Sequence, residues 1–429
     1  MIRRRTRPSL FCAAVGLAIL GLAAQKPSAP ATPEPSSTKA PATEAPAELP
    51  AGLLLALAQF EVSPEGKVLP KPGPARLDVL YRQGGSWLVQ TIEDPESNVF
   101  HKAMVYAPPG APPGILTLGG TAAALKLWRR SGQTGFVSET LWQADFGGKF
   151  SRLRDAEAAD LYGDGFLSLA IASHDQGVVA TVRPKPTGGY ESKELDRQKD
   201  TFVHEIEVGD LDGDGAAEVY ATPSEPNRFD GTPQPGKVVR YVPRSGSGRT
   251  VVAELGTRHA KEILVGDVDG DGRDELYVSV ESESSLAPVE ILRYEAGTPA
   301  DQGLTIATIE DRLCRFLTAG DIDGDGKKEI VAAAYKSGVW LLRPGADAKR
   351  SWSVESIDRD SSGFEHAALL TDLDRDGVDE LYVASDDQGE VRRYVWSGGS
   401  MRRSTIFKRK VPRSALTWNI QPVPAALLK

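Results

Sequence analysis

Sulfur and imidazole side chains are scarce in this chain of 429 residues, which contains two cysteines, three methionines and five histidines. One cysteine, Cys12, lies in an N-terminal apolar run that we expect to be removed from the mature protein. Cys314 would then be the only cysteine left, so no internal disulfide is possible. The packed core and any bound metal ions must therefore hold the fold together.

Signature motifs of common enzyme classes are also missing. The chain has no GxSxG nucleophile elbow, no HExxH zinc motif, no Walker-type phosphate loop and no GxGxxG after a first strand. His174-Asp175 and His204-Glu205 could be drawn as acid–base pairs, but neighbouring residues on a strand point to opposite faces. The sequence therefore favours a protein that is not an enzyme and leaves catalysis open as an alternative.

Apolar runs approaching the length of a membrane span are lacking after the N-terminus. The one run of this kind, Leu10 to Ala24, follows four arginines between positions 3 and 7 and is short for a membrane span. This layout is typical of a secretory signal peptide over residues 1–24, with an uncleaved anchor as the alternative. We expect a mature chain without a transmembrane span, as a secreted, periplasmic or cell-surface protein.

Residues 25–50 consist mainly of Pro, Ala, Thr, Ser and Glu and contain very few large apolar side chains. Such a composition buries too little surface to offset the entropy of ordering, which predicts a disordered tether. One folded domain is then expected over residues 51–429.

Positive charge is in deficit. The formal net charge is −9, and removal of the four leader arginines takes it to −13. A strongly acidic chain is a poor partner for nucleic acid or an anionic membrane, so neither is expected.

The chain contains several similar acidic loops. The stretch Asp210 to Glu218 reads DLDGDGAAE, and near-copies begin at Asp267, Asp321 and Asp372. Carboxylates at positions 1, 3, 5 and 9, with a glycine at position 6 that permits a tight turn, offer the hard oxygen ligands that calcium prefers. We therefore predict about four bound calcium ions.

The predicted ligands are the carboxylates at positions 1, 3, 5 and 9 and the backbone carbonyl at position 7 of each loop. They are Asp210, Asp212, Asp214, Ala216 and Glu218; Asp267, Asp269, Asp271, Arg273 and Glu275; Asp321, Asp323, Asp325, Lys327 and Glu329; and Asp372, Asp374, Asp376, Val378 and Glu380. A related loop at Asp160 has Tyr162 at position 3 and Ser168 at position 9, so it should bind metal weakly or not at all.

These loops differ from EF-hands, in which the last ligand stands at position 12 and helices flank the loop. Here apolar runs of β type flank each loop, for example Glu218-Val219-Tyr220-Ala221. The segments resemble the FG-GAP/VCBS repeats of calcium-binding β-propellers, including the head of integrin α-chains. The resemblance covers roughly residues 53 to 429, and it implies an all-β propeller.

The repeat spacing predicts the number of blades. First aspartates at 160, 210, 267, 321 and 372 are separated by 50 to 57 residues, the length of a four-stranded blade. A sixth repeat begins near Phe100, although its loop at Ala107 lacks acids. Leu53 to Ile92 and Leu416 to Ile420 look like the two parts of one blade shared by the termini. We expect seven blades, with six as the alternative.

A basic or imidazole residue stands six positions before the first position of each of six loops. These residues are His101, Arg154, His204, Lys261, Arg315 and His366. In a propeller they would surround the channel mouth away from the calcium loops, a candidate face for an anionic or polyhydroxylated ligand. Three histidines also predict that the charge of this ring increases as the pH falls through about 6.5.

Together these features predict a secreted, calcium-stabilised propeller that acts as a ligand-binding or scaffold module, and we expect it to be a monomer. Its partner would be a glycan, an anionic small molecule or a protein. The alternative is a polysaccharide-active lyase or hydrolase that uses the histidine-bearing face opposite the calcium loops.

Overall fold

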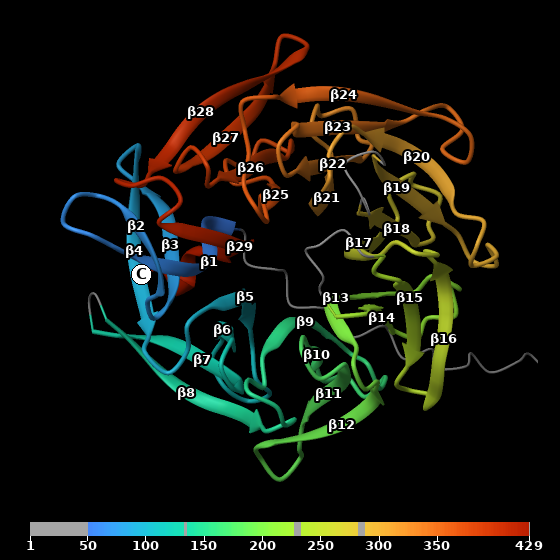
Figure 1. Cartoon of the computed structure of the whole chain (residues 1–429), viewed down its shortest axis with the longest axis horizontal. Helices are drawn as coiled ribbons and strands as arrows, with labels where there is room; N and C mark the ends of the chain where they lie inside the picture. Colours follow the sequence, from blue (N-terminus) through green and yellow to red (C-terminus); the bar gives the residue numbers. More distant parts are fainter. Residues whose placement is uncertain (1–49, 133–134, 227–232, 282–287, 429) are drawn as a thin grey trace, which may run out of the picture. The chain divides into compact units, whose positions relative to one another are not determined.

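Residues 50–132, 135–226, 233–281 and 288–428 are described by the structure, which is a computed structural model. In this part of the chain seven antiparallel sheets follow one another around a ring (Figure 1). The one helical element among the described residues is a short 3₁₀ turn, η1 (Ala425–Leu427). The expected seven-bladed all-β propeller is confirmed.

Six blades each consist of four consecutive strands, paired in chain order. Blade 2 contains β5 (Phe100–Tyr106), β6 (Gly114–Gly119), β7 (Ala123–Ser131) and β8 (Gly135–Ala144). Blade 3 contains β9 (Leu153–Ala159), β10 (Ser168–Ser173), β11 (Val178–Pro184) and β12 (Tyr190–Arg197). Blade 4 contains β13 (Phe202–Gly209), β14 (Glu218–Ser224), β15 (Lys237–Val242) and β16 (Ser247–Glu254).

Blades 5 to 7 repeat this arrangement. Blade 5 contains β17 (Ala260–Gly266), β18 (Glu275–Val280), β19 (Val289–Tyr294) and β20 (Leu304–Ile309). Blade 6 contains β21 (Cys314–Gly320), β22 (Glu329–Ala334), β23 (Gly338–Pro344) and β24 (Trp352–Asp358). Blade 7 contains β25 (Ala368–Thr371), β26 (Glu380–Ser385), β27 (Glu390–Ser397) and β28 (Ser400–Lys408).

Blade 1 joins the two ends of the described chain. Its innermost strand is β29 (Ala415–Pro424), followed outward by β1 (Pro50–Val62), β3 (Ala75–Gln83) and β4 (Ser86–Asp94). The far end of β1 also pairs with β2 (Val68–Pro72), an extra strand that the sequence did not predict. In the register of the seam Leu55 lies opposite Ile420. The composite blade is therefore confirmed, and the six-blade alternative is wrong.

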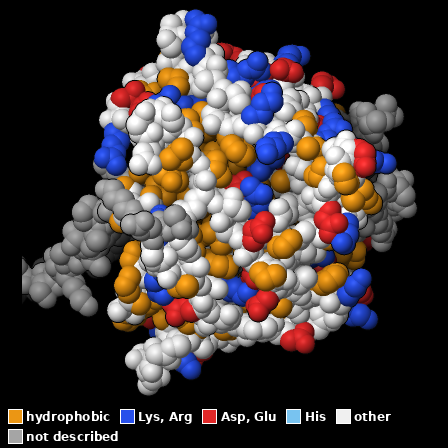
Figure 2. All heavy atoms as spheres, turned by 90° about the vertical axis from the view of Figure 1, so that its left-hand side faces the viewer, with side chains coloured by type: hydrophobic (Ala, Val, Ile, Leu, Met, Phe, Trp, Pro, Cys, Tyr) orange, Lys and Arg blue, Asp and Glu red, His pale blue; other side chains and the backbone are white. Residues whose placement is uncertain are grey.

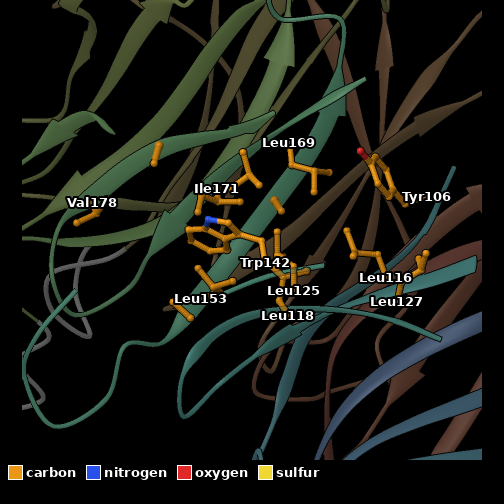
Figure 3. Close-up of a cluster of buried hydrophobic side chains, with 14 residues drawn as sticks. Tyr106, Leu116, Leu118, Leu125, Leu127, Trp142, Leu153, Leu169, Ile171 and Val178 are labelled. Atoms are coloured by element: carbon orange, nitrogen blue, oxygen red, sulfur yellow. The ribbon is translucent and has the colours of Figure 1, made fainter. Parts of the chain in front are cut away.

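Apolar side chains fill the spaces between neighbouring blades. Figure 3 shows one such layer, where Tyr106, Leu116 and Leu127 of blade 2 lie near Leu169 and Ile171 of blade 3. Every residue of the second strands β10, β14, β18, β22 and β26 is buried, because neighbouring blades cover both faces of these strands. The outer strands are largely exposed, as β12 and β28 illustrate.

The inner strands fix where the candidate sites lie. β5, β9, β13, β17, β21, β25 and β29 lie nearest the centre of the ring (Figure 1). The acidic loops follow the last residues of four of these strands, and the predicted basic residues stand near the other ends.

The outer surface carries charges of both signs. Figure 2 shows Lys and Arg side chains interspersed with Asp and Glu on one side of the molecule. No helix among the described residues is long and apolar enough to cross a bilayer. The signal peptide and the tether expected from the sequence lie outside the described residues.

Candidate functional site

Each of the four acidic loops folds into the same turn between the first and second strands of its blade. The first aspartate accepts a hydrogen bond from the backbone N–H at position 6, with Gly215 N to Asp210 Oδ2 at 2.7 Å and Gly326 N to Asp321 Oδ2 at 2.8 Å. The glycine at position 6 has a positive φ, for example 79° at Gly215, which a residue with a Cβ rarely adopts. The motif thus favours a tight acidic turn.

The turn brings carboxylates together in all four loops. Oxygens within 4.8 Å of one another come from Asp210, Asp212 and Asp214; from Asp267, Asp269, Asp271 and Glu275; from Asp321, Asp323 and Asp325; and from Asp372, Asp374 and Glu380. The aspartates at positions 1 and 3 therefore meet in every loop. Glu218, Glu329 and Asp376, which the sequence placed among the ligands, are not in these clusters.

The chemistry of these clusters fits a hard divalent cation. Three or four carboxylates within a few ångströms repel one another, and calcium prefers oxygen ligands of this kind. At Asp323 one carboxylate oxygen, Oδ1, is buried without a hydrogen-bond partner, which leaves it available to a cation. The part played by the position-7 carbonyls stays a prediction.

The glutamate at position 9 has structural partners of its own. Its Oε2 accepts the backbone N–H of position 2, at 3.1 Å from Leu211 N in the first loop and 2.9 Å from Leu373 N in the last. In the loop of blade 5 the Tyr277 hydroxyl donates to the same oxygen of Glu275 at 3.1 Å. Burial raises the pKa of Glu275 and of Glu329 to about 7. These glutamates therefore tie each loop to its blade.

An arginine on the third strand of each of these blades contacts the loop, a feature that the sequence analysis missed. Arg240 Nη1 lies 2.9 Å from Asp212 Oδ2 and 2.6 Å from Glu218 Oε1. The equivalent contacts are made by Arg293 in blade 5, Arg343 in blade 6 and Arg393 in blade 7. The signal was present in the sequence, because an arginine recurs 13 to 22 residues after the last position of each loop.

The loop at Asp160 keeps the turn without the carboxylates. Gly165 N donates to Asp160 Oδ2 at 2.8 Å, as in the complete loops. Arg183 of β11 is paired with Asp164 and lies over the Tyr162 ring at 4.7 Å. Among the described residues no cluster of three candidate metal ligands forms in this loop. The turn is therefore compatible with a loop that binds no metal.

Neighbouring loops also touch one another through position 8. Asp274 Oδ2 accepts the backbone N–H of Asp210 in the preceding blade at 2.8 Å, and Asp379 Oδ2 accepts that of Asp321 at 2.9 Å. Between these two pairs Lys328 Nζ donates to the carbonyl oxygen of Asp267 at 3.0 Å. The four loops thus form a continuous chain of contacts from blade 4 to blade 7.

The six predicted basic residues lie at the other ends of the inner strands, and all six are buried. Five are on inner strands, whereas His366 precedes β25 and has a left-handed backbone with φ of 60°. A ring exposed to solvent was expected. The structure instead has a buried polar layer, because acidic side chains from outside the repeat register lie against the cations.

Two glutamates that sequence reasoning missed account for much of this layer. Glu365 accepts from Arg315 Nη1 at 2.7 Å and lies 3.5 Å from Arg154 Nη2, so it links blades 3 and 6. Glu281 Oε1 accepts from Arg315 Nε at 2.8 Å, and its other oxygen lies 3.0 Å from His259 Nε2. Neither glutamate stands at a repeated position, so the spacing offered no signal for them.

Lys261 differs from the other cations of this layer. The residue is only 6% exposed, and no hydrogen bond or ion pair of its ammonium group is found among the described residues. Burial is the main reason that its pKa is lowered to about 8; Glu281 and Glu365 oppose this shift, whereas Arg315 and Arg154 add to it. An ammonium in a largely buried layer that lacks a direct hydrogen bond is costly, and an anion would relieve that cost.

The expected charging of the ring near pH 6.5 is wrong for its histidines. Burial, with positive neighbours, holds the pKa of His101 and of His204 well below the usual value and lowers that of His366 to about 4. His101 Nδ1 lies 2.7 Å from the Leu153 carbonyl oxygen, and His204 Nε2 lies 3.2 Å from Ser224 Oγ. These imidazoles are therefore neutral at pH 6.5.

His174 and Asp175 also differ from expectation. They were expected to point to opposite faces of a strand, but they lie in the turn after β10, and His174 Nδ1 is 2.6 Å from Asp175 Oδ1. The ring of His174 lies 5.0 Å from that of His204. The turn lets adjacent side chains meet, which the strand argument did not allow for.

Comparison with known proteins agrees with this architecture. Residues 267–332 match the FG-GAP-like repeat family. Integrin alpha pat-2 from Caenorhabditis briggsae and integrin alpha pat-2 from Caenorhabditis elegans are each 23% identical to the chain over 242 residues. That similarity takes in 48% of this chain, which spans about a fifth of the length of these relatives, 19% in each. The repeated loops, the ring of seven sheets and these matches identify the chain as a β-propeller that contains an FG-GAP-like repeat.

Proposed function

We propose that the chain is a calcium-stabilised propeller that works outside the cytoplasm as a ligand-binding or scaffold module. The observation that carries the metal assignment is the meeting of carboxylate oxygens within 4.8 Å in four equivalent loops. The calcium ions would neutralise the loops and connect the inner strand of each blade to the next strand. The similarity to integrin α-chains supports a role in binding rather than in catalysis.

Metal titration tests the first part of this proposal. Extracellular calcium sites have dissociation constants of about 10⁻⁴ to 10⁻³ M. A ligand present at 100 times its dissociation constant adds about 2.7 kcal/mol per independent site. Desalted protein should bind about four calcium ions, and its melting temperature should rise when calcium replaces chelator. Identical melting curves in both conditions would refute a stabilising role.

The ligand site is proposed to lie in the buried polar layer around Lys261. Arg154 and Arg315 are paired with Glu365, and Arg315 is also paired with Glu281. Lys261 is attracted electrostatically to both glutamates without a direct ion pair. Of these three cations, the ammonium of Lys261 is the one without a direct hydrogen bond or ion pair among the described residues. We expect it to bind a carboxylate or phosphate group, which supplies the missing acceptor oxygens.

Binding calorimetry tests this site. The ligands are inorganic phosphate, a uronic acid and the neutral sugar that has the same ring without the carboxylate. Lys261→Met should abolish anion binding, and the melting temperature, measured in parallel, checks that the variant is folded. Lys410→Met, which removes an exposed lysine near β28, is the matched control. Equal anion affinity in wild type and Lys261→Met would move the ligand site elsewhere.

One observation favours the alternative of a polysaccharide-active enzyme. The His174–Asp175 pair has the geometry by which a carboxylate orients an imidazole for proton transfer. A reducing-end assay on acidic polysaccharides, comparing wild type with His174→Gln, distinguishes the two functions. Cleavage that disappears in the variant would favour the enzyme, whereas binding without cleavage in both proteins would favour the module.

A further inference from the structure

In each of blades 4 to 7 an arginine on the third strand contacts the acidic loop, which is the predicted metal loop of that blade. In blade 6 Arg343 Nη1 lies 2.7 Å from Asp323 Oδ2 and 2.9 Å from Glu329 Oε1. In blade 5 Arg293 Nη2 lies 2.7 Å from Asp269 Oδ2 and 3.1 Å from Glu275 Oε1. In each case one guanidinium nitrogen bridges the carboxylates at positions 3 and 9. Both of these carboxylates also belong to the predicted ligand set.

The arginine makes the same contact from two different positions on the third strand. Arg240, Arg293 and Arg393 lie opposite Tyr220, Tyr277 and Tyr382 in the strand register. In blade 6 the residue at the tyrosine position is Val331, which pairs with Leu341, and Arg343 stands two residues further along β23. Its guanidinium nevertheless reaches the same two carboxylates. The shared feature is therefore the contact and not the position in the strand.

The loop at Asp160 shows where the third-strand arginine lies when the set of carboxylate ligands is incomplete. Positions 3 and 9 are Tyr162 and Ser168, yet the backbone turn is retained. Arg183 contacts Asp164 at position 5 and lies over the Tyr162 ring. A guanidinium is thus the cation next to this loop, as it is next to the four complete loops.

We propose that these arginines are permanent counter-ions of the metal loops, which share the carboxylates at positions 3 and 9 with the bound cation. This inference rests on the proposed calcium binding. The guanidinium relieves repulsion between the carboxylates and keeps the loop folded without metal. It also repels an incoming cation and occupies two of its ligands, so it weakens calcium binding.

The positive charge of the guanidinium determines the direction in which its removal changes calcium affinity. Two positive groups a few ångströms apart repel each other, so removal of the guanidinium should tighten metal binding by about tenfold. The same change leaves the carboxylates uncompensated when metal is absent, so the metal-free protein should melt at a lower temperature. Opposite effects on the two states distinguish a counter-ion from a residue that only orients ligands, whose loss would weaken binding.

Blade 6 offers a local probe for the experiment. Trp396 of β27 lies against Arg343, with the guanidinium carbon 5.1 Å from the ring centre. Terbium, a trivalent surrogate for calcium, luminesces when energy reaches it from a nearby tryptophan. Competition of calcium against terbium in the full chain, with the signal of a Trp396→Phe variant subtracted, therefore reports on the loop at Asp321.

Three variants separate charge from shape. Arg343→Met should tighten calcium binding in this loop about tenfold and lower the melting temperature in chelator. Arg343→Lys keeps the charge and should leave the affinity within a few-fold of wild type. Arg350→Met, which removes a guanidinium with 84% side-chain exposure, should change neither quantity.

The outcomes bear differently on the two proposals. Unchanged or weaker calcium binding in Arg343→Met, with wild type binding normally, would overturn the counter-ion role and leave the proposed function intact. Wild-type protein that binds no calcium would overturn the proposed function itself. If Arg343→Met fails to fold, an affinity in Arg343→Lys that is more than tenfold weaker than wild type would still refute the role.

Discussion

At the scale of single residues, the glycine before the first aspartate decides how closely two acidic loops can approach. A Cβ on Gly320 would overlap the carboxylate of Asp379, which accepts the backbone N–H of Asp321. Gly266 stands at the same place before Asp267, but a Cβ there would meet nothing within 4 Å. The same motif position is therefore crowded in one blade and open in another.

This difference predicts contrasting effects of alanine. Gly320→Ala should lower the free energy of unfolding by about 1–3 kcal/mol, because the loop must shift or lose its hydrogen bond to Asp379. Gly266→Ala should change it by less than about 0.5 kcal/mol. Denaturant unfolding in chelator measures both without interference from metal. Equal losses in the two variants would show that the loop contact contributes nothing.

A second residue-scale prediction concerns pH. His366 is fully buried, with Nδ1 2.6 Å from the Ala334 carbonyl oxygen and Nε2 2.7 Å from Ser361 Oγ. Burial lowers its pKa to about 4, with Arg392 acting in the same direction and Asp311 and Asp387 opposing it. The unfolded state therefore binds the extra proton first. The stabilising contribution is present above the ordinary pKa and is lost as the pH falls toward 4.

His366→Asn tests this effect, since asparagine tolerates the left-handed backbone and does not titrate. Between pH 7 and pH 5 the wild type should lose about 2 kcal/mol more stability than the variant. Unfolding free energies at several pH values measure the difference. Parallel pH profiles for the two proteins would show that His366 carries no proton-linked stability.

At the scale of elements, the strands and loops were predictable because they repeat. The regular spacing of the aspartates and the buried second strands defined the blades, and the incomplete segments at the two ends predicted the shared one. The arginine contacts were not predictable from the loop motif alone, because the arginines lie outside it on the third strand and at varying distances from the loop. The buried state of Arg315 depends on Glu281 and Glu365, which follow no repeat.

The loop at Asp160 provides an element-scale prediction. Its turn matches the complete loops, and it lacks only the carboxylates at positions 3 and 9. Tyr162→Asp combined with Ser168→Glu should therefore create a further calcium site and raise the metal stoichiometry by one. Tyr162→Asn with Ser168→Gln, which adds amide groups without their charge, is the matched control. An unchanged stoichiometry in the acidic variant would mean that the strand contacts of this blade prevent binding.

At the scale of the whole ring, the seam between β29 and β1 closes the propeller. β29 contributes Thr417, whose N–H donates to Asp386 Oδ2 of blade 7 at 2.6 Å, and Ile420, which lies in the apolar layer with Tyr382. The strand thus connects blade 7 to blade 1. It also covers the edge of β1, which would otherwise be free to pair with another chain.

Removal of the seam strand should therefore be far more damaging than its length suggests. A chain that ends before Ala415 should lose cooperative unfolding and should associate at micromolar concentration, which calorimetry and light scattering measure. A chain that ends after Pro424 keeps β29 and should remain folded and monomeric. A cooperative, monomeric protein without β29 would show that the other six blades are sufficient.

The seam between β29 and β1 also determines the order in which parts of the domain can fold. Blade 1 cannot be completed until Ile420 is available to lie opposite Leu55, so the beginning of the domain must wait for nearly the whole chain to be made. Until then its inner edge is exposed, and the search for the missing strand spans the longest loop that the fold contains. Closure of the ring is thus expected to be the slow, late step, and this interval is when a chaperone would be of most use.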